Sequence, residues 1–192
     1  MFQVQSTIRG ALAGLALAAM AATGAQAATA DVVLTIEEIG GSQTLFKAEG
    51  ALDLTTLGGS SPSVSSPLSA PLSGAFGVGE SGANTVFFQS ALGSLTPYGT
   101  GGDIFGGDVS GPLFALSGGF GGILRIGASY VSGTAFTSTN LVTGDFADLG
   151  VTPGATAFYT LNDGQTISLE VLTPTPIPLP PAAFLLLGGL GA

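Results

Sequence analysis

Short stretches in which apolar and polar residues alternate constrain the fold of this chain most strongly. The alternation is clearest over residues 32–37, where Val32, Leu34 and Ile36 share one side, and over residues 166–171. Successive side chains of a strand point to opposite faces, so each stretch predicts a strand with one buried face. Further predicted strands cover residues 44–48, 52–54, 85–89, 123–126 and 155–161.

Glycine-containing turns separate these strands, and they favour an all-β fold. Asn162, Asp163 and Gly164 lie between two predicted strands and predict a hairpin turn. Residues 60–73, rich in serine and proline, predict an irregular surface loop. No capped amphipathic helix of useful length follows residue 27. We therefore predict one domain over residues 28–173, an antiparallel β-sandwich of the jelly-roll-like or immunoglobulin-like kind with glycine-rich loops.

The composition excludes several classes of chemistry. The chain has no cysteine and no histidine, so thiol nucleophiles, disulfides, Ser-His-Asp triads and the usual zinc ligands are ruled out. Only three of the 192 residues are Lys or Arg, and the net charge is −9. Binding to nucleic acid depends on many contacts from basic side chains to phosphate, so we expect no nucleic-acid partner.

The first 27 residues predict a secretory signal peptide with a helical apolar part. Arg9 supplies the positive charge before an uncharged run over residues 10–22. Ala25, Gln26 and Ala27 form an A-x-A cleavage site, because small side chains fit the pockets of signal peptidase. We expect cleavage to leave Ala28 as the new N-terminus. The mature protein is then exported to the periplasm, the outer surface or the extracellular matrix.

The C-terminal region carries a proline-rich segment followed by an apolar one. Five of the nine residues 173–181 are proline, which is typical of a stiff polyproline II spacer, and residues 182–192 are uncharged. This arrangement resembles the PEP-CTERM class of bacterial sorting tags in its VPLPA-type variant. The residues that match the tag are Ile177, Pro178, Leu179, Pro180 and Ala182, with the apolar run that Ala182 begins.

The resemblance implies a Gram-negative, exopolysaccharide-producing host in which exosortase, a membrane peptidase, recognises the tag. In that class a full membrane helix and a cluster of arginines follow the motif. Here Pro181 is an additional proline, the eleven apolar residues reach only about 16 Å as a helix, and the basic cluster is missing. We expect a linker and sorting motif at residues 174–181 and the start of a truncated transmembrane segment at residues 182–192. Transient membrane anchoring then requires the full tail.

Stretches of the central region also resemble PEP-CTERM precursors. They cover residues 33–38, 50–55, 127–134 and 146–154. The resemblance assigns no catalytic residue to them, and it leaves the molecular activity open.

Three sets of residues are candidates for chemistry. Gly77, Gly79 and Gly82 fit the G-x-G-x-x-G pattern, but a chain this rich in glycine contains roughly 0.9 such matches by chance, so we expect a turn. Asp103 and Asp108 lie in a glycine-rich segment that could bind Ca²⁺, although the spacing matches no EF-hand loop and a solvated loop is the simpler interpretation.

The third set is a carboxylate pair, Asp145 and Asp148, which could serve as the acid and the base or nucleophile of glycoside hydrolysis, although carboxylates close in sequence are common on any acidic surface. Since the chain has no tryptophan, the residues available to stack on a sugar ring are Tyr98, Tyr130 and Tyr159. Our leading hypothesis is an exported protein that is not an enzyme, needs no cofactor, and has a structural or interaction role linked to exopolysaccharide. Its partners during export are signal peptidase and exosortase. The alternatives are a carbohydrate- or Ca²⁺-binding module and a carboxylate-based glycosidase.

Overall fold

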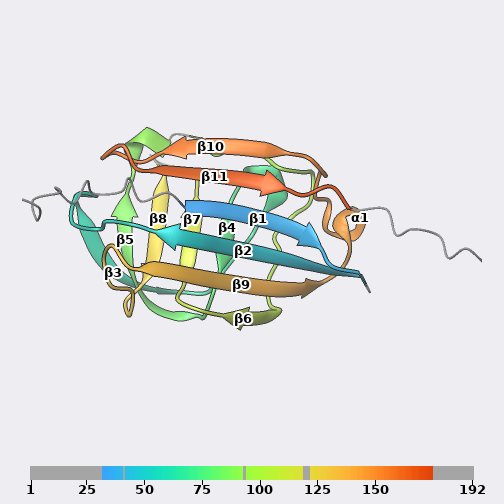
Figure 1. Ribbon diagram of the computed structural model, residues 1–192, viewed down its shortest axis with the longest axis horizontal. Helices are drawn as coiled ribbons and strands as arrows, with labels where there is room; N and C mark the ends of the chain where they lie inside the picture. The colour runs from blue at the N-terminus through green and yellow to red at the C-terminus, as the bar shows by residue number, and fades with distance from the viewer. Residues whose placement is uncertain (1–31, 41, 93, 119–121, 175–192) are drawn as a thin grey trace, which may run out of the picture.

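The computed structural model describes residues 32–40, 42–92, 94–118 and 122–174. Within these residues two β-sheets lie face to face, and the strands of the front sheet run across those of the back sheet (Figure 1). The all-β class predicted from the alternating stretches is confirmed. The expectation of purely antiparallel pairing is wrong at one place, because β1 and β11 are parallel neighbours.

The six-stranded sheet has the strand order β10-β11-β1-β2-β9-β6. Its strands are β1 (Val32–Glu38), β2 (Gln43–Ala51), β6 (Asp108–Ser110), β9 (Ala135–Thr143), β10 (Thr156–Thr160) and β11 (Thr166–Val171).

The five-stranded sheet has the strand order β3-β5-β8-β7-β4. Its strands are β3 (Ser60–Ser65), β4 (Phe76–Val78), β5 (Gly82–Phe88), β7 (Phe114–Ser117) and β8 (Ile123–Gly127). Three short helices complete the described elements, and they are η1 (Pro71–Ser73), η2 (Ser90–Leu92) and α1 (Phe146–Leu149).

The core lies between the sheets and is formed by the inward side of the alternating strands. Val32, Leu34 and Ile36 of β1 are fully buried, as their spacing predicts. Phe46 of β2 meets Phe76 of β4 with their ring centroids 6.1 Å apart, so the two sheets contact each other directly. Burying a side chain of this size contributes about 1.5–3 kcal/mol, and the core therefore holds the sheets together without disulfides.

Two predictions about local structure are wrong. Residues 60–73, predicted as an irregular loop, contain the edge strand β3 and the helix η1. Strand β3 has no buried residue, so it lacks the apolar alternation that reveals the other strands, and an edge strand tolerates Pro62.

The predicted strand at residues 52–54 is instead a turn. Asp53 donates its backbone N–H to Gln165 Oε1 at 2.7 Å, and Thr55 donates its own to Asp53 Oδ1 at 2.9 Å. Hydrogen bonds from Thr55 and Ser132 lower the pKa of Asp53. Leu52 is buried here by tertiary packing, and strand pairing plays no part.

The connection from β3 to β4 has to cross the whole five-stranded sheet, because these two strands form its opposite edges. Residues 66–75, which we call the strap, cross over the outer face of the sheet. A Cβ atom on Gly77 of β4 would lie 2.6 Å from the backbone nitrogen of Leu68, so the strap touches the strand at this point. The Ser69 hydroxyl forms hydrogen bonds with both backbone groups of Gly77. The strap is therefore fixed to the sheet that it covers.

The terminal predictions fall outside the described residues. These include the cleavage site at Ala25, Ala27 and Ala28 and the sorting motif with Ile177, Pro178, Leu179, Pro180 and Ala182. In the part of the chain that the structure describes, no helix has the length and apolar character that crossing a membrane requires.

Candidate functional site

Asp145, one of the two carboxylates considered for hydrolysis, caps a helix. Asp145 precedes α1, and its Oδ1 accepts a hydrogen bond from the backbone N–H of Asp148 at 2.8 Å. The helix ends after one turn at Gly150, which adopts the left-handed conformation. The short spacing between the two carboxylates is thus explained by N-capping.

Two of the three tyrosines considered for sugar stacking are buried in the core, and Tyr130 is partly buried. Tyr98 is 1% exposed and donates its hydroxyl to the carbonyl of Ala75 at 2.7 Å, and burial raises its pKa far above the ordinary value. Tyr159 is also buried. The hydroxyl of Tyr130 accepts the backbone N–H of Leu52 at 2.7 Å. The expectation that Tyr98 and Tyr159 present a sugar-binding ring is therefore wrong.

The two glycine-rich candidates take different places. The G-x-G-x-x-G residues run from β4 through a turn into β5, so the turn is confirmed and no helix follows to bind a pyrophosphate. Asp108 begins β6, and the exposed Asp103 lies in the loop before it. Among the described residues, no group of three or more acidic side chains is close enough to hold a metal ion.

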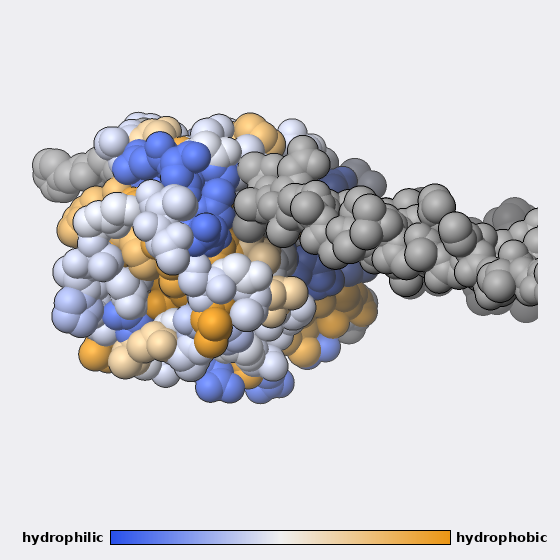
Figure 2. All heavy atoms as spheres, turned by 60° about the vertical axis from the view of Figure 1, so that its left-hand side comes forward, coloured by the Kyte–Doolittle hydropathy of each residue, from blue (hydrophilic) through white to orange (hydrophobic). Residues whose placement is uncertain are grey.

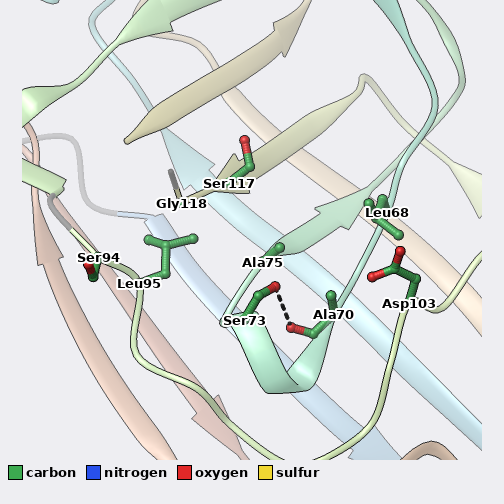
Figure 3. Close-up of a pocket in the computed structure, with 9 residues that line it drawn as sticks. All are labelled: Leu68, Ala70, Ser73, Ala75, Ser94, Leu95, Asp103, Ser117 and Gly118. Atoms are coloured by element: carbon green, nitrogen blue, oxygen red, sulfur yellow. Dashed lines mark hydrogen bonds between the residues drawn. The ribbon is translucent and has the colours of Figure 1, made fainter. Parts of the chain in front are cut away.

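Two hollows lie on the outer face of the five-stranded sheet, beside the strap. They adjoin, have volumes of about 450 Å³ and 200 Å³, and share Leu68, Ala75 and Ser117 as lining residues. We call the two together the outer groove. Figure 3 shows the larger hollow, with Leu95 on one side and Leu68 and Asp103 on the other.

Arg125 of β8 lines the smaller hollow from the centre of the sheet. Its neighbours Leu124 and Ile126 face the core, so the alternation of the strand places Arg125 on the outer face. Its Nη1 donates to the hydroxyl of Ser117 at 2.8 Å. Its Nε is buried and has no acceptor within the described chain. Leaving a buried donor without an acceptor costs about 1–3 kcal/mol of folding free energy. The described chain supplies no acceptor for the Nε–H of Arg125.

Serine residues line both hollows of the outer groove. Ser65 and Ser66 line the smaller hollow with Ser117, while Ser73 and Ser94 line the larger one. Ser65 also accepts a hydrogen bond from Asn84 Nδ2 at 2.8 Å, which fixes the end of β3 on the sheet. The lining therefore offers several donors and acceptors and one cation, the pattern that orients a polar ligand.

An exposed aromatic ring stands on the same outer face. Phe88 of β5 is 56% exposed and pairs with Ile123, two residues along β8 from Arg125. Diagonal neighbours of this kind are about 7–8 Å apart, within reach of one ligand.

On the face that Figure 2 shows, hydrophobic side chains are scattered among hydrophilic ones, without a single continuous apolar patch.

Sequence reasoning missed both Arg125 and Phe88. Arg125 stands within a predicted strand, and it is the only Lys or Arg after Lys47 in the chain. That isolation was a usable signal. A comparison of the chain with protein-family models, with curated proteins and with solved structures finds no match.

Proposed function

We propose that this chain is an exported protein of the cell envelope or extracellular matrix of a Gram-negative bacterium. In this proposal it is not an enzyme, and its β-sandwich binds exopolysaccharide through the outer groove. Signal peptidase and exosortase act on it during export. Its jelly-roll-like or immunoglobulin-like character stays a prediction. The signal pattern before Ala28 and the likeness of residues 177–182 to a sorting tag support export.

The outer groove is the observation that carries the binding role. Polysaccharides present hydroxyl groups and the apolar faces of sugar rings. The groove offers serine hydroxyls, and the exposed ring of Phe88 lies diagonally across the sheet from Arg125. Aromatic rings supply a rigid apolar surface at a low entropic cost. The capping role of Asp145 removes the main argument for a glycosidase.

The test compares two phenylalanines that differ in position. Phe88 lies beside the groove, and Phe158 is 67% exposed on β10 of the other sheet. We expect the full chain to migrate more slowly in native gels that contain exopolysaccharide purified from the host. Phe88→Ala should lose most of this retardation, because it removes the ring beside the groove, whereas Phe158→Ala should keep it.

If both variants lost the gel retardation equally, a site at the groove would be contradicted, because the polysaccharide would then adhere to the protein surface in general. If exopolysaccharide did not retard even the unmodified chain, the proposed binding role would be wrong. Circular dichroism of each variant checks that the β-sheet content is unchanged.

A further inference from the structure

The charges of the described residues single out Arg125. The described part of the chain contains two basic residues, Lys47 and Arg125. Lys47 forms an ion pair with Glu49 at 2.7 Å on the six-stranded sheet. Arg125 forms no ion pair with a described residue, although the chain has 12 acidic side chains. A half-buried arginine in so acidic a chain is thus held without a carboxylate partner of its own.

The Nε atom of Arg125 is buried and unpaired within the described chain, so a ligand in the groove would meet the guanidinium at its terminal Nη groups. The neighbours of Arg125 across the sheet are Ala115 and Val86, whose side chains offer no acceptor. The hydrogen bond to Ser117 fixes one nitrogen and so orients the planar group. A guanidinium has five N–H donors in a fork that matches the two oxygens of a carboxylate or sulfate.

The outer groove has space and polarity for a ligand that extends beyond this one charge. The hollow at Arg125 continues past Ser117 and Leu68 into the larger hollow, which Asp103 lines. A carboxylate at Asp103 accepts hydrogen bonds from neutral hydroxyls and repels an anion. The groove therefore has a carboxylate in its larger hollow and the guanidinium of Arg125 in its smaller hollow.

We propose that Arg125 makes the outer groove selective for acidic polysaccharide, by binding the carboxylate or sulfate group of a charged sugar. This inference rests on the proposed function and narrows its ligand class from exopolysaccharide in general to anionic exopolysaccharide. Ser65, Ser66 and Ser117 then bind the hydroxyls of the same sugar unit.

The net charge of −9 gives this binding an unusual dependence on salt. A protein that binds a polyanion through many surface cations releases it as salt rises. Here the long-range force is repulsive and is screened by salt, whereas the contact at Arg125 is short and half-buried and is screened less. Binding should therefore stay level or strengthen between low and physiological ionic strength.

The experiment uses three polymers with one backbone, which are dextran, carboxymethyl dextran and dextran sulfate. We expect the full chain to bind one or both charged polymers at least about tenfold more tightly than dextran, a ratio that corresponds to about 1.4 kcal/mol. Arg125→Gln should abolish this preference. Lys47→Gln is the matched control, because it makes the same change in net charge on the other sheet, and it should keep the preference.

A second variant, Arg125→Lys, extends the test. Lysine keeps the charge but lacks the forked N–H donors of arginine, so Arg125→Lys should lose part of the preference for charged polymers. If Arg125→Gln does not fold, Arg125→Lys is the variant that tests the inference. Comparing the two charged polymers shows whether carboxylate or sulfate is the preferred anion. A preference that survives in Arg125→Gln with an unchanged circular dichroism spectrum overturns the inference.

The inference and the proposed function fail in different ways. Binding of dextran as tight as that of both charged polymers overturns the acidic selectivity and leaves polysaccharide binding standing. Failure to bind any of the three polymers and the host exopolysaccharide overturns the proposed function as well.

Discussion

At the scale of single residues, most of the polar side chains that suggested chemistry are hydrogen-bonded to the backbone. Asp145 accepts the N–H of Asp148, and Tyr98 donates to Ala75. Such groups are common in a loop-rich β domain, since turns leave backbone donors and acceptors that side chains must satisfy. Arg125 is different because part of its hydrogen-bonding capacity is unused within the described chain.

The capping role of Asp145 separates structure from catalysis. Asp145→Ala should lower the free energy of unfolding by about 0.5–2 kcal/mol, because it removes the acceptor for the N–H of Asp148. Asp145→Asn keeps an oxygen at that place and should be nearly as stable as the unmodified chain. Urea denaturation of the two variants measures this difference. Equal destabilisation by both changes would argue against the cap.

Burial of Tyr98 makes the protein sensitive to alkali. Its pKa is raised in the folded state mainly by desolvation, so the unfolded chain ionises first, near the ordinary value of 10.0. The stabilisation of the neutral form is thus complete below pH 10 and is lost as the pH rises above it, at about 1.4 kcal/mol per pH unit for each such group. Tyr98→Phe should reduce the decline in urea midpoint between pH 10 and 11, and Tyr159, whose pKa is also raised, should account for part of the remainder. An unchanged decline would rule out Tyr98 as a source.

At the scale of elements, alternation of apolar residues predicted β1, β8, β10 and β11 within a few residues of their bounds. It failed for β9, because two of the four inward-facing residues of that strand, Ser138 and Asn140, are polar. Likewise β3 has no buried side to reveal it. The outer groove could not be predicted for another reason: it depends on strand order, which brings the strap and Arg125 to one hollow, and local sequence patterns carry no information on that order.

Contact between the strap and β4 gives a prediction at this scale. Gly77→Ala should lower stability by about 1–3 kcal/mol, because the new methyl group would overlap the backbone of Leu68 and push the strap off the sheet. Gly59→Ala is the control, since a Cβ atom there meets nothing within 4 Å. Thermal unfolding measures both variants. Equal melting temperatures for the two would show that the strap does not press on β4.

At the scale of the whole molecule, the two sheets present outer faces of different character. The face of the six-stranded sheet carries the Lys47–Glu49 pair, in which the positive charge is neutralised. The face of the five-stranded sheet carries the strap, the outer groove and the unpaired charge of Arg125. A chain of net charge −9 thereby keeps a local positive charge on the outer face of the five-stranded sheet, the face on which we propose that polysaccharide binds.

The parallel pairing of β1 and β11 determines how the molecule responds to a mechanical load. Parallel strands begin at the same end of a sheet, so the chain enters β1 at Val32 at one end and leaves β11 at Val171 at the opposite end (Figure 1). Tension between the two termini therefore slides these strands past each other in shear. The hydrogen bonds from the Val32–Ile167 register to the Ile36–Val171 register then share the load together, which resists rupture better than unzipping them one by one. Under such tension the sandwich would hold by this parallel pair of strands.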